Sequence, residues 1–282
     1  MLNAITIDVE EYFQVSAFEK YVKCEEWGTF PPRVELNTLK ILDMLDEFSV
    51  KATFFILGWI AEHHPSLIRE VQKRGHEIAC HGYNHELIYN IGHDRFRQDI
   101  KKAKMLLEDL CGREVSYYRA PSYSITEKSL WALDILIEEG FTCDSSIFPI
   151  HHDLYGIPDA IRFPHTIDRQ HGVIREFPVS TFEVGFSGHK FRIPVSGGGY
   201  LRLLPVRFIK RALRHINECE REPVILYFHP WEIDPEQPRI RAGIKSRFRH
   251  YINLDRTMGK IKYLLSSFRF APVSQVLDAN EN

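Results

Sequence analysis

The sequence predicts an α/β fold built on a parallel sheet, either open or closed into a barrel. Through the first two thirds of the chain, short apolar runs alternate with amphipathic stretches, and glycine or proline marks several of the boundaries between them. Such strand–helix alternation is typical of parallel sheets whose strands are connected by helices. A chain of 282 residues, 44% of them hydrophobic, is also long enough to bury a large core.

The expected elements of the N-terminal half follow one another regularly. Helices are predicted where apolar residues recur at helical spacing, beginning near Pro65 or Thr126 and ending before Gly75, Gly112 or Gly140. Strands are predicted where a short run is almost wholly apolar. The predicted strands are residues 4–9, 52–57, 76–80 and 115–119, and the predicted helices are residues 34–48, 65–74, 94–110 and 126–139.

The pattern changes between about residues 145 and 200, where proline and glycine become frequent. Alternating runs at 173–177 and 190–195 indicate a β-rich insertion with a hairpin turn near Ser187 and Gly188. A helix at 205–221, a strand at 224–228 and a helix near 255–268 are expected to follow. We therefore expect one domain spanning residues 1–282, with this insertion and a helical C-terminal extension from about residue 231 to 282.

Composition and sequence patterns limit the kinds of partner and the cellular compartment that we expect. The 36 basic and 38 acidic residues nearly balance, which argues against a nucleic-acid partner. No apolar run approaches the roughly 20 residues of a transmembrane segment, and the N-terminus lacks the pattern of a signal peptide. We expect a cytoplasmic protein, with membrane-peripheral association as a variant, and a homo-oligomer is compatible with the sequence. The basic stretch 239–249 is either a solvated helix face, the simpler interpretation, or a contact for an anionic partner.

Reactive side chains follow four of the predicted strands. Because the carboxyl ends of parallel strands meet at one edge, these side chains are expected to share a site. A G-x-S-x-G motif and a G-x-G-x-x-G motif after the first strand are both missing, which argues against a serine nucleophile and a dinucleotide site. The four segments are Thr6–Glu10, His81–His85, Arg119–Tyr123 and Tyr227–Trp231.

Two histidines and an acid could hold a metal. His81 and His85 are four residues apart, so in a helical turn both imidazoles would face one way. With 14 histidines chance alone gives about 0.7 such pairs, and a surface pair is the simple alternative. Two imidazoles and one carboxylate leave an open position on Zn²⁺ for water or substrate. Asp8 and Glu10 alternate along a strand, so one could bind metal while the other takes a proton; a solvated acidic strand end is the alternative.

Arg119 and His229 complete the constellation. A guanidinium beside Asp8 would keep that carboxylate ionised and fixed in orientation, although an ordinary surface arginine is the usual interpretation of such a residue. His229 follows four apolar residues, where a titratable ring is costly unless it is paired. It is either a satisfied core histidine or a general acid for a leaving group.

Taken in order, these segments resemble the polysaccharide deacetylase family, carbohydrate esterase family 4. Its members carry an aspartate pair on the first strand, then H-[ST]-x-x-H, R-x-P-Y, a later aspartate and L-x-x-H. The match runs from residue 4 to about 230. Three C-terminal stretches, Gly197–Tyr200, His229–Glu232 and Phe248–Tyr251, resemble the subgroup tied to exosortase and exopolysaccharide gene clusters. The resemblance implies a deformed (β/α) barrel of about seven parallel strands and metal-dependent removal of N- or O-acetyl groups from sugars.

The resemblance also implies roles for individual residues. Asp8 resembles the catalytic base, and His81 and His85 resemble the imidazole ligands of a divalent metal, with Zn²⁺ first and Co²⁺, Ni²⁺ or Fe²⁺ as alternatives. Position 9 is valine, so Glu10 is assigned as the third ligand. Glycine at position 82, where the family has serine or threonine, is expected to loosen the metal loop.

The remaining roles concern the transition state. Arg119 resembles the arginine that orients the base, and His229 the general acid. Asp144 resembles the acid that tunes the final histidine. Ser122 stands where the family often has tyrosine, so its backbone N–H is the expected oxyanion donor.

Aromatic residues adjoin the same segments and could stack on sugar rings, although buried core aromatics are an equal alternative. The expected substrate is an N-acetylated polysaccharide or its lipid-linked precursor. A small cyclic amide or imide such as allantoin is a second hypothesis, and a non-catalytic glycan-binding protein is a third. The candidate substrate-binding residues are Tyr12, Phe13, Tyr123 and Trp231.

Overall fold

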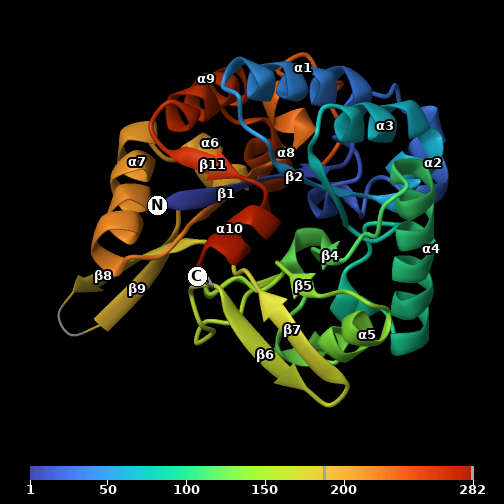
Figure 1. The fold of residues 1–282 in the computed structure, drawn as a ribbon. Coiled ribbons are helices and arrows are strands. Elements are labelled where there is room, and N and C mark those ends of the chain that lie inside the picture. The colour runs from blue at the N-terminus through green and yellow to red at the C-terminus, as the bar shows by residue number, and fades with distance from the viewer. Residues whose placement is uncertain (187–188, 281–282) are drawn as a thin grey trace.

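A computed structural model gives the structure of residues 1–186 and 189–280. A nine-stranded sheet lies at its centre, in the order β10-β1-β2-β3-β4-β5-β7-β6, and β11 also pairs with β1 (Figure 1). Every pair is parallel except β6–β7. The strands are β1 (Leu2–Val9), β2 (Thr53–Ile56), β3 (Glu77–Cys80), β4 (Tyr117–Tyr118), β5 (Cys143–Asp144), β6 (His165–Arg169), β7 (Gly172–Glu176), β10 (Ile225–Phe228) and β11 (Arg269–Ala271).

Helices surround this sheet (Figure 1) and explain why its strands read as continuous apolar runs. Both faces of β1 are covered, so its residues from Asn3 to Val9 are all buried. The helices are α1 (Val34–Glu47), α2 (Gly58–His63), α3 (Pro65–Lys73), α4 (His93–Cys111), α5 (Ala132–Glu138), α6 (Gly198–Leu203), α7 (Val206–His215), α8 (Ile244–Tyr251), α9 (Leu254–Leu265) and α10 (Val273–Asn280).

The α/β class and the parallel sheet are confirmed, and most predicted elements are present within a residue or two of their expected bounds. Three differ. The predicted strand 115–119 keeps only the two residues of β4, and the predicted helix 126–139 is a short 3-10 turn followed by α5. The predicted helix 205–221 is α7 followed by a π-helical turn over Ile216–Glu220, and it ends at Arg221 in the left-handed conformation.

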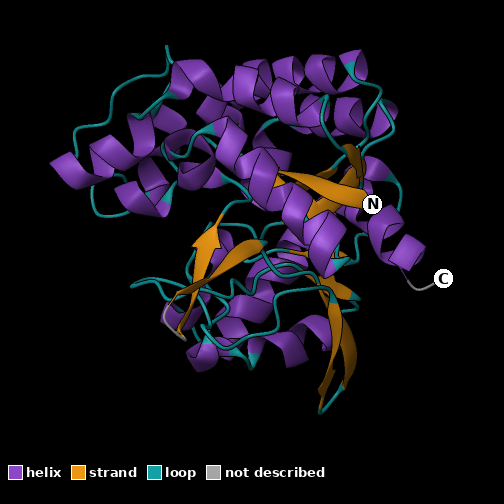
Figure 2. Ribbon diagram, turned by 90° about the vertical axis from the view of Figure 1, so that its left-hand side faces the viewer, coloured by secondary structure: helices purple, strands orange, loops and turns teal. Residues whose placement is uncertain are grey.

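The predicted β-rich insertion contributes to the main sheet. Its run 173–177 is β7, which pairs in parallel with β5 and antiparallel with β6. The second run, 190–195, is β9 (His189–Pro194), which pairs antiparallel with β8 (Thr181–Phe186). The predicted turn at Ser187 and Gly188 lies outside the described residues. Figure 2 shows the two strand pairs extending below the main body of helices.

The C-terminal extension returns to the start of the chain. It contains α8, α9 and α10, and β11 pairs with β1 at Leu2–Ala4. In the described ranges, no helix combines the length and the apolar character that crossing a membrane requires.

Because β1, β3, β4 and β10 run parallel in one sheet, their carboxyl ends lie at the same edge. The segments that follow these strands supply the side chains described next.

Candidate metal and catalytic site

Three side chains from two strand ends converge as predicted for a metal site. Potential ligand atoms of Glu10, His81 and His85 all lie within 4.8 Å of one another, and all three residues are buried. Nε2 of His85 is 2.7 Å from Oε2 of Glu10. Two imidazoles and a carboxylate at this spacing are a suitable donor set for a divalent cation such as Zn²⁺.

The loop that carries the two histidines is not the helical turn that their spacing indicated. Gly82 and His85 adopt positive φ angles of 75° and 55°, which turn the loop back on itself. Asp99 on α4 accepts hydrogen bonds from the backbone N–H groups of Tyr83 (2.7 Å) and Asn84 (3.1 Å). A Cβ atom at position 82 would lie 2.8 Å from Oδ2 of Asp99. Glycine at position 82 therefore allows α4 to tie the loop down, whereas we expected it to loosen the loop.

His81 and Glu10 are held in the forms that bind metals. Nδ1 of His81 lies 2.8 Å from the carbonyl oxygen of Arg119, which leaves Nε2 to face the other donors. Burial lowers the pKa of His81 to about 4, so the ring is neutral at pH 7. Burial raises the pKa of Glu10, but the opposing attraction of His85 and His229 is stronger and holds that pKa well below its ordinary range. Glu10 is therefore a carboxylate.

Asp8 lies beside these three residues and forms an ion pair with Arg119, as the sequence predicted. Nη1 of Arg119 donates to Oδ1 of Asp8 at 2.6 Å and to the Thr6 hydroxyl at 2.8 Å. The other side of the guanidinium donates to the carbonyl and hydroxyl oxygens of Ser145, and its centre lies 4.1 Å from the centre of the Phe55 ring. Arg119 is fully buried. These contacts fix the orientation of the Asp8 carboxylate.

His229 faces both acids from the end of β10. Its Nε2 is 3.9 Å from Oδ2 of Asp8 and 3.6 Å from Oε1 of Glu10. Its Nδ1 is 2.6 Å from Oε1 of Glu232. Burial lowers the pKa of His229, but attraction to Glu10 and the hydrogen bond to Glu232 outweigh burial and raise it to about 9. His229 is thus a paired histidine that carries a proton at neutral pH.

The acid paired with His229 differs from the sequence expectation. We expected Asp144, but Glu232 occupies that place, three residues after the histidine in the short helical turn Pro230–Ile233. Glu232 also accepts the backbone N–H of His229 at 3.2 Å, as the acid of a capping box does. Asp144 instead lies opposite Glu176 in the β5–β7 pair and accepts the Ser146 hydroxyl. The spacing of a capping box in His229–Glu232 was the available sequence signal.

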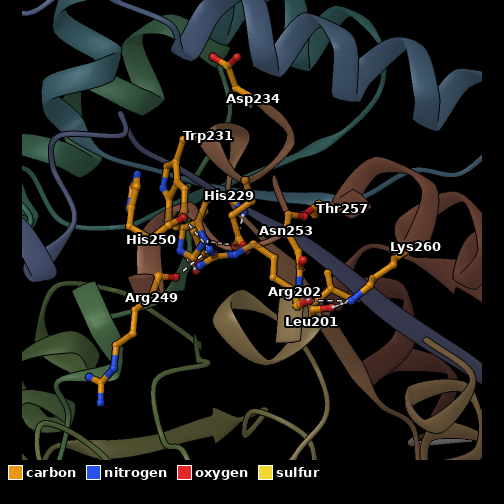
Figure 3. A network of polar contacts seen from close by, with 12 residues as sticks. Leu201, Arg202, His229, Trp231, Asp234, Arg249, His250, Asn253, Thr257 and Lys260 are labelled. Carbon is orange, nitrogen blue, oxygen red and sulfur yellow. Dashed lines mark hydrogen bonds and ion pairs between the residues drawn. The ribbon is translucent and has the colours of Figure 1, made fainter. Parts of the chain in front are cut away.

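Arg202 was missed by the sequence analysis. Its Nε donates to Oε2 of Glu232 at 2.6 Å, and both side chains are almost completely buried. Its Nη1 donates to the carbonyl oxygens of Arg249 (2.8 Å) and His250 (2.6 Å). Figure 3 shows how this network connects α6, η7 (Pro230–Ile233) and the segment around α8. Arg202 lies before the helix predicted from residue 205, and the local sequence gave no signal for this contact.

Ser122 occupies the short turn Pro121–Tyr123 after β4, with a positive φ of 50°. Its hydroxyl is 2.6 Å from the hydroxyl of Ser16. Among the described residues, its backbone N–H has no hydrogen-bond acceptor. The structure therefore leaves this N–H free to donate, as the predicted oxyanion role requires. Tyr123 is buried and packs edge-on against Tyr227, with ring centres 5.1 Å apart.

The aromatic residues expected to stack on sugar rings are core residues in this structure. Tyr12 is 0% and Phe13 2% exposed, within an aromatic cluster that includes Trp27 and Trp59. Such burial leaves no ring face for a sugar, so the alternative interpretation of these two residues holds. Trp231 is also buried, and its indole N–H donates to Oε1 of Glu10 at 3.0 Å. Trp231 therefore orients the Glu10 carboxylate.

Two family models match consecutive segments of the chain. Residues 28–136 match a family described as "Polysaccharide deacetylase", and residues 145–278 match "Domain of unknown function (DUF3473)". A peptidoglycan-N-acetylglucosamine deacetylase of Bacillus cereus is 37% identical over 116 residues, which are 40% of this chain and 42% of that protein. This chain thus matches less than half of that relative.

Solved structures share the fold. A protein of Mycobacterium smegmatis, classed provisionally as a polysaccharide deacetylase, superimposes with a TM-score of 0.62 at 22% identity, covering 99% of this chain and 89% of that one. The Puue allantoinase superimposes with a TM-score of 0.60 at 14% identity, covering 98% and 88%. At these identities the likeness establishes the α/β fold.

Proposed function

We propose that this chain, whose residues 28–136 match the polysaccharide deacetylase family, is a divalent-metal-dependent hydrolase that removes acetyl groups from an N-acetylated polysaccharide or its lipid-linked precursor. One observation carries the proposal: the metal-donor triad lies beside an arginine-held aspartate and a paired histidine. The resemblance of the C-terminal motifs supports an exopolysaccharide or other cell-envelope glycan as the substrate.

Glu10, His81 and His85 are the residues that would hold the metal. Their donor set suits Zn²⁺ first and Co²⁺, Ni²⁺ or Fe²⁺ as alternatives. A cation bound there would polarise the acetyl carbonyl and lower the pKa of water. Neighbouring groups already orient two of these donors: the indole N–H of Trp231 is hydrogen-bonded to Glu10, and the backbone carbonyl of Arg119 to His81.

Asp8 is the proposed general base. It lies next to the triad without being part of it, and Arg119 holds one of its oxygens at 2.6 Å. The other oxygen, Oδ2, lies 3.9 Å from Nε2 of His229 and is the one that would take the proton from water. Asp8 takes a proton from this water as the water oxygen attacks the acetyl carbon.

Ser122 and His229 complete the acyl transfer. The free N–H of Ser122 donates to the oxyanion that forms when the carbonyl becomes tetrahedral. The C–N bond then breaks, and His229 gives its proton to the departing sugar nitrogen, so that acetate and an amine are released. The same positions serve an O-acetyl group, with an alcohol as the leaving group.

Glu232 and Arg202 are proposed as positioning residues for this last step. Glu232 binds Nδ1 of His229 and so directs the opposite nitrogen, Nε2, toward Asp8 and Glu10. Arg202 neutralises Glu232 and anchors it to the chain near α8. Both partners are buried, so neither can turn to solvent.

The direct test uses purified protein loaded with Zn²⁺ or Co²⁺ and oligomers of N-acetylglucosamine. We expect acetate release by the wild type, and a loss of at least about 100-fold in Asp8→Asn, because its amide cannot accept the proton. Metal content should stay unchanged, and Asp43→Asn, at an exposed position, should retain full activity.

Activity surviving in Asp8→Asn would show that another group is the base. Ring opening of allantoin without acetate release would show that the substrate is a cyclic amide and not an acetylated glycan. A wild-type protein that binds the oligomers but hydrolyses neither substrate would overturn the enzymatic proposal.

A further inference from the structure

A stretch of positive charge follows the catalytic turn. From residue 237 to 254 the sequence has five basic residues and no acidic one. All five side chains are exposed, and none forms an ion pair with any residue that the structure describes. We call them the basic patch, and they are Arg239, Arg241, Lys245, Arg247 and Arg249.

Two large apolar side chains stand within this patch. Ile244 is 86% exposed and Phe248 is 59% exposed, and they lie one helical turn apart on the same side of α8. With Arg239, Arg247 and Tyr251 they line a shallow pocket of about 330 Å³. Exposing large apolar side chains to water is unfavourable, and an exposed apolar patch rimmed by charged residues is typical of an interaction surface.

The inner side of this segment is firmly held. His250 is buried, stacks on Trp231 with ring centres 4.1 Å apart, and has Nε2 2.7 Å from Oε1 of Gln237. Arg202 binds two carbonyl oxygens at the end of α8, whereas the Arg249 side chain points away from this network (Figure 3). Because the inner face is anchored, the outer apolar face is a fixed feature of the surface.

We propose that the basic patch, with Ile244 and Phe248, docks the protein on a membrane surface that contains anionic phospholipid. The cations attract the negatively charged headgroups, and the two apolar side chains enter the boundary between headgroups and acyl chains. A hydrophilic polyanion would satisfy the charges, but it would leave Ile244 and Phe248 exposed to water. The pairing of charge with apolar groups therefore favours the lipid surface.

Docking here would bring the candidate site close to the bilayer. His250, at the end of the patch segment, stacks on Trp231, which donates to Glu10 of the metal triad. The patch and the triad are thus connected through only two side chains. A glycan carried on a lipid would then be presented near the site, a consequence that rests on the proposed function while the docking itself does not.

The test is co-sedimentation of the full chain with vesicles of phosphatidylcholine alone and of phosphatidylcholine with 30% phosphatidylglycerol. We expect binding to the anionic vesicles only. Ile244→Ser with Phe248→Ser should weaken this binding by at least about fivefold because the inserted groups are lost. The pair Met105→Ser and Phe191→Ser removes exposed apolar groups elsewhere and should have no effect.

Charge has its own matched control. Arg241→Gln with Arg247→Gln should weaken binding by about fivefold or more. Arg207→Gln with Arg211→Gln removes the same charge from exposed positions on α7 and should change binding less than twofold.

Equal effects of the two charge pairs would reduce the interaction to net charge and overturn the proposal. Unchanged binding after the loss of Ile244 and Phe248 would also overturn it. If the wild type did not bind vesicles, and light scattering showed a dimeric wild type but monomeric patch variants, the patch would be assigned to contact with a second copy of the chain. Acetate release from soluble oligomers should be unaffected, so failure of docking and failure of the deacetylase proposal are told apart.

Discussion

At the scale of single residues, the site depends on buried charged side chains that form ion pairs with one another. Arg119 binds Asp8, and Arg202 binds Glu232, which in turn binds His229. Buried charges are costly unless they are paired and hydrogen-bonded. Each pairing therefore also fixes a geometry, which is the property that proton transfer needs.

Glu232→Gln tests whether this acid serves the general acid. The amide keeps the size of the side chain but loses the charge that favours the imidazolium. We expect kcat for an N-acetylated oligomer to fall about tenfold or more with little change in KM. Hydrolysis of p-nitrophenyl acetate should change less than about threefold, because that leaving group needs no proton.

The matched control is Glu220→Gln, which breaks another partly buried ion pair, with Arg162 at 2.5 Å. It should alter stability without changing the ratio of the two activities. Equal losses on both substrates in Glu232→Gln would mean that the residue only supports the fold.

At the scale of elements, α4 sets the shape of the loop that carries His81 and His85. Its Asp99 accepts two backbone N–H groups of the loop, and burial raises the pKa of Asp99 to about 6. Asp99→Ala should release the loop and weaken Zn²⁺ binding by about 10- to 100-fold, as loss of outer-shell contacts commonly does. Isothermal titration measures this, with Asp94→Ala on the same helix as the control. Unchanged affinity would show that the loop holds its shape without α4.

The pairing of β2 with β3 gives a pH-dependent prediction. Nδ1 of His76 accepts the backbone N–H of Ala52 at 3.1 Å, and burial lowers the pKa of His76 to about 4. The unfolded chain, with a pKa near 6.5, takes up this proton first as the pH falls. The free energy of unfolding should therefore decrease between about pH 6.5 and 4.

Urea denaturation at a series of pH values measures the effect, and His76→Asn should flatten this part of the profile. Parallel profiles for the two proteins would exclude His76 as the cause.

The elements of the fold were largely predictable because they repeat local patterns. Apolar periodicity and the terminal glycines predicted α1, α3 and α4 to within a few residues, as Gly112 shows with its left-handed conformation at the end of α4. The loop of His81 and His85 was not predictable, since its path depends on Asp99, which is distant in sequence. Glu232 replaced Asp144 for a similar reason: spatial proximity decides which acid meets His229.

At the scale of the whole molecule, the site joins both parts of the chain. The metal donors, Asp8 and Arg119 come from the first 119 residues, and His229, Glu232 and Arg202 come from the region that matches a domain of unknown function. The parallel pairing of β1 with β10 brings the two sets together. Neither part carries a full set of catalytic groups, so we propose that they act as one catalytic domain.

The most direct measurement is anomalous diffraction at the zinc edge from a crystal grown with Zn²⁺. We predict one strong peak at bonding distance from Glu10, His81 and His85, with Asp8 beside it and not bound to it. A peak confined to surface histidines, or no peak near the triad, would contradict the assignment of this triad as a metal centre.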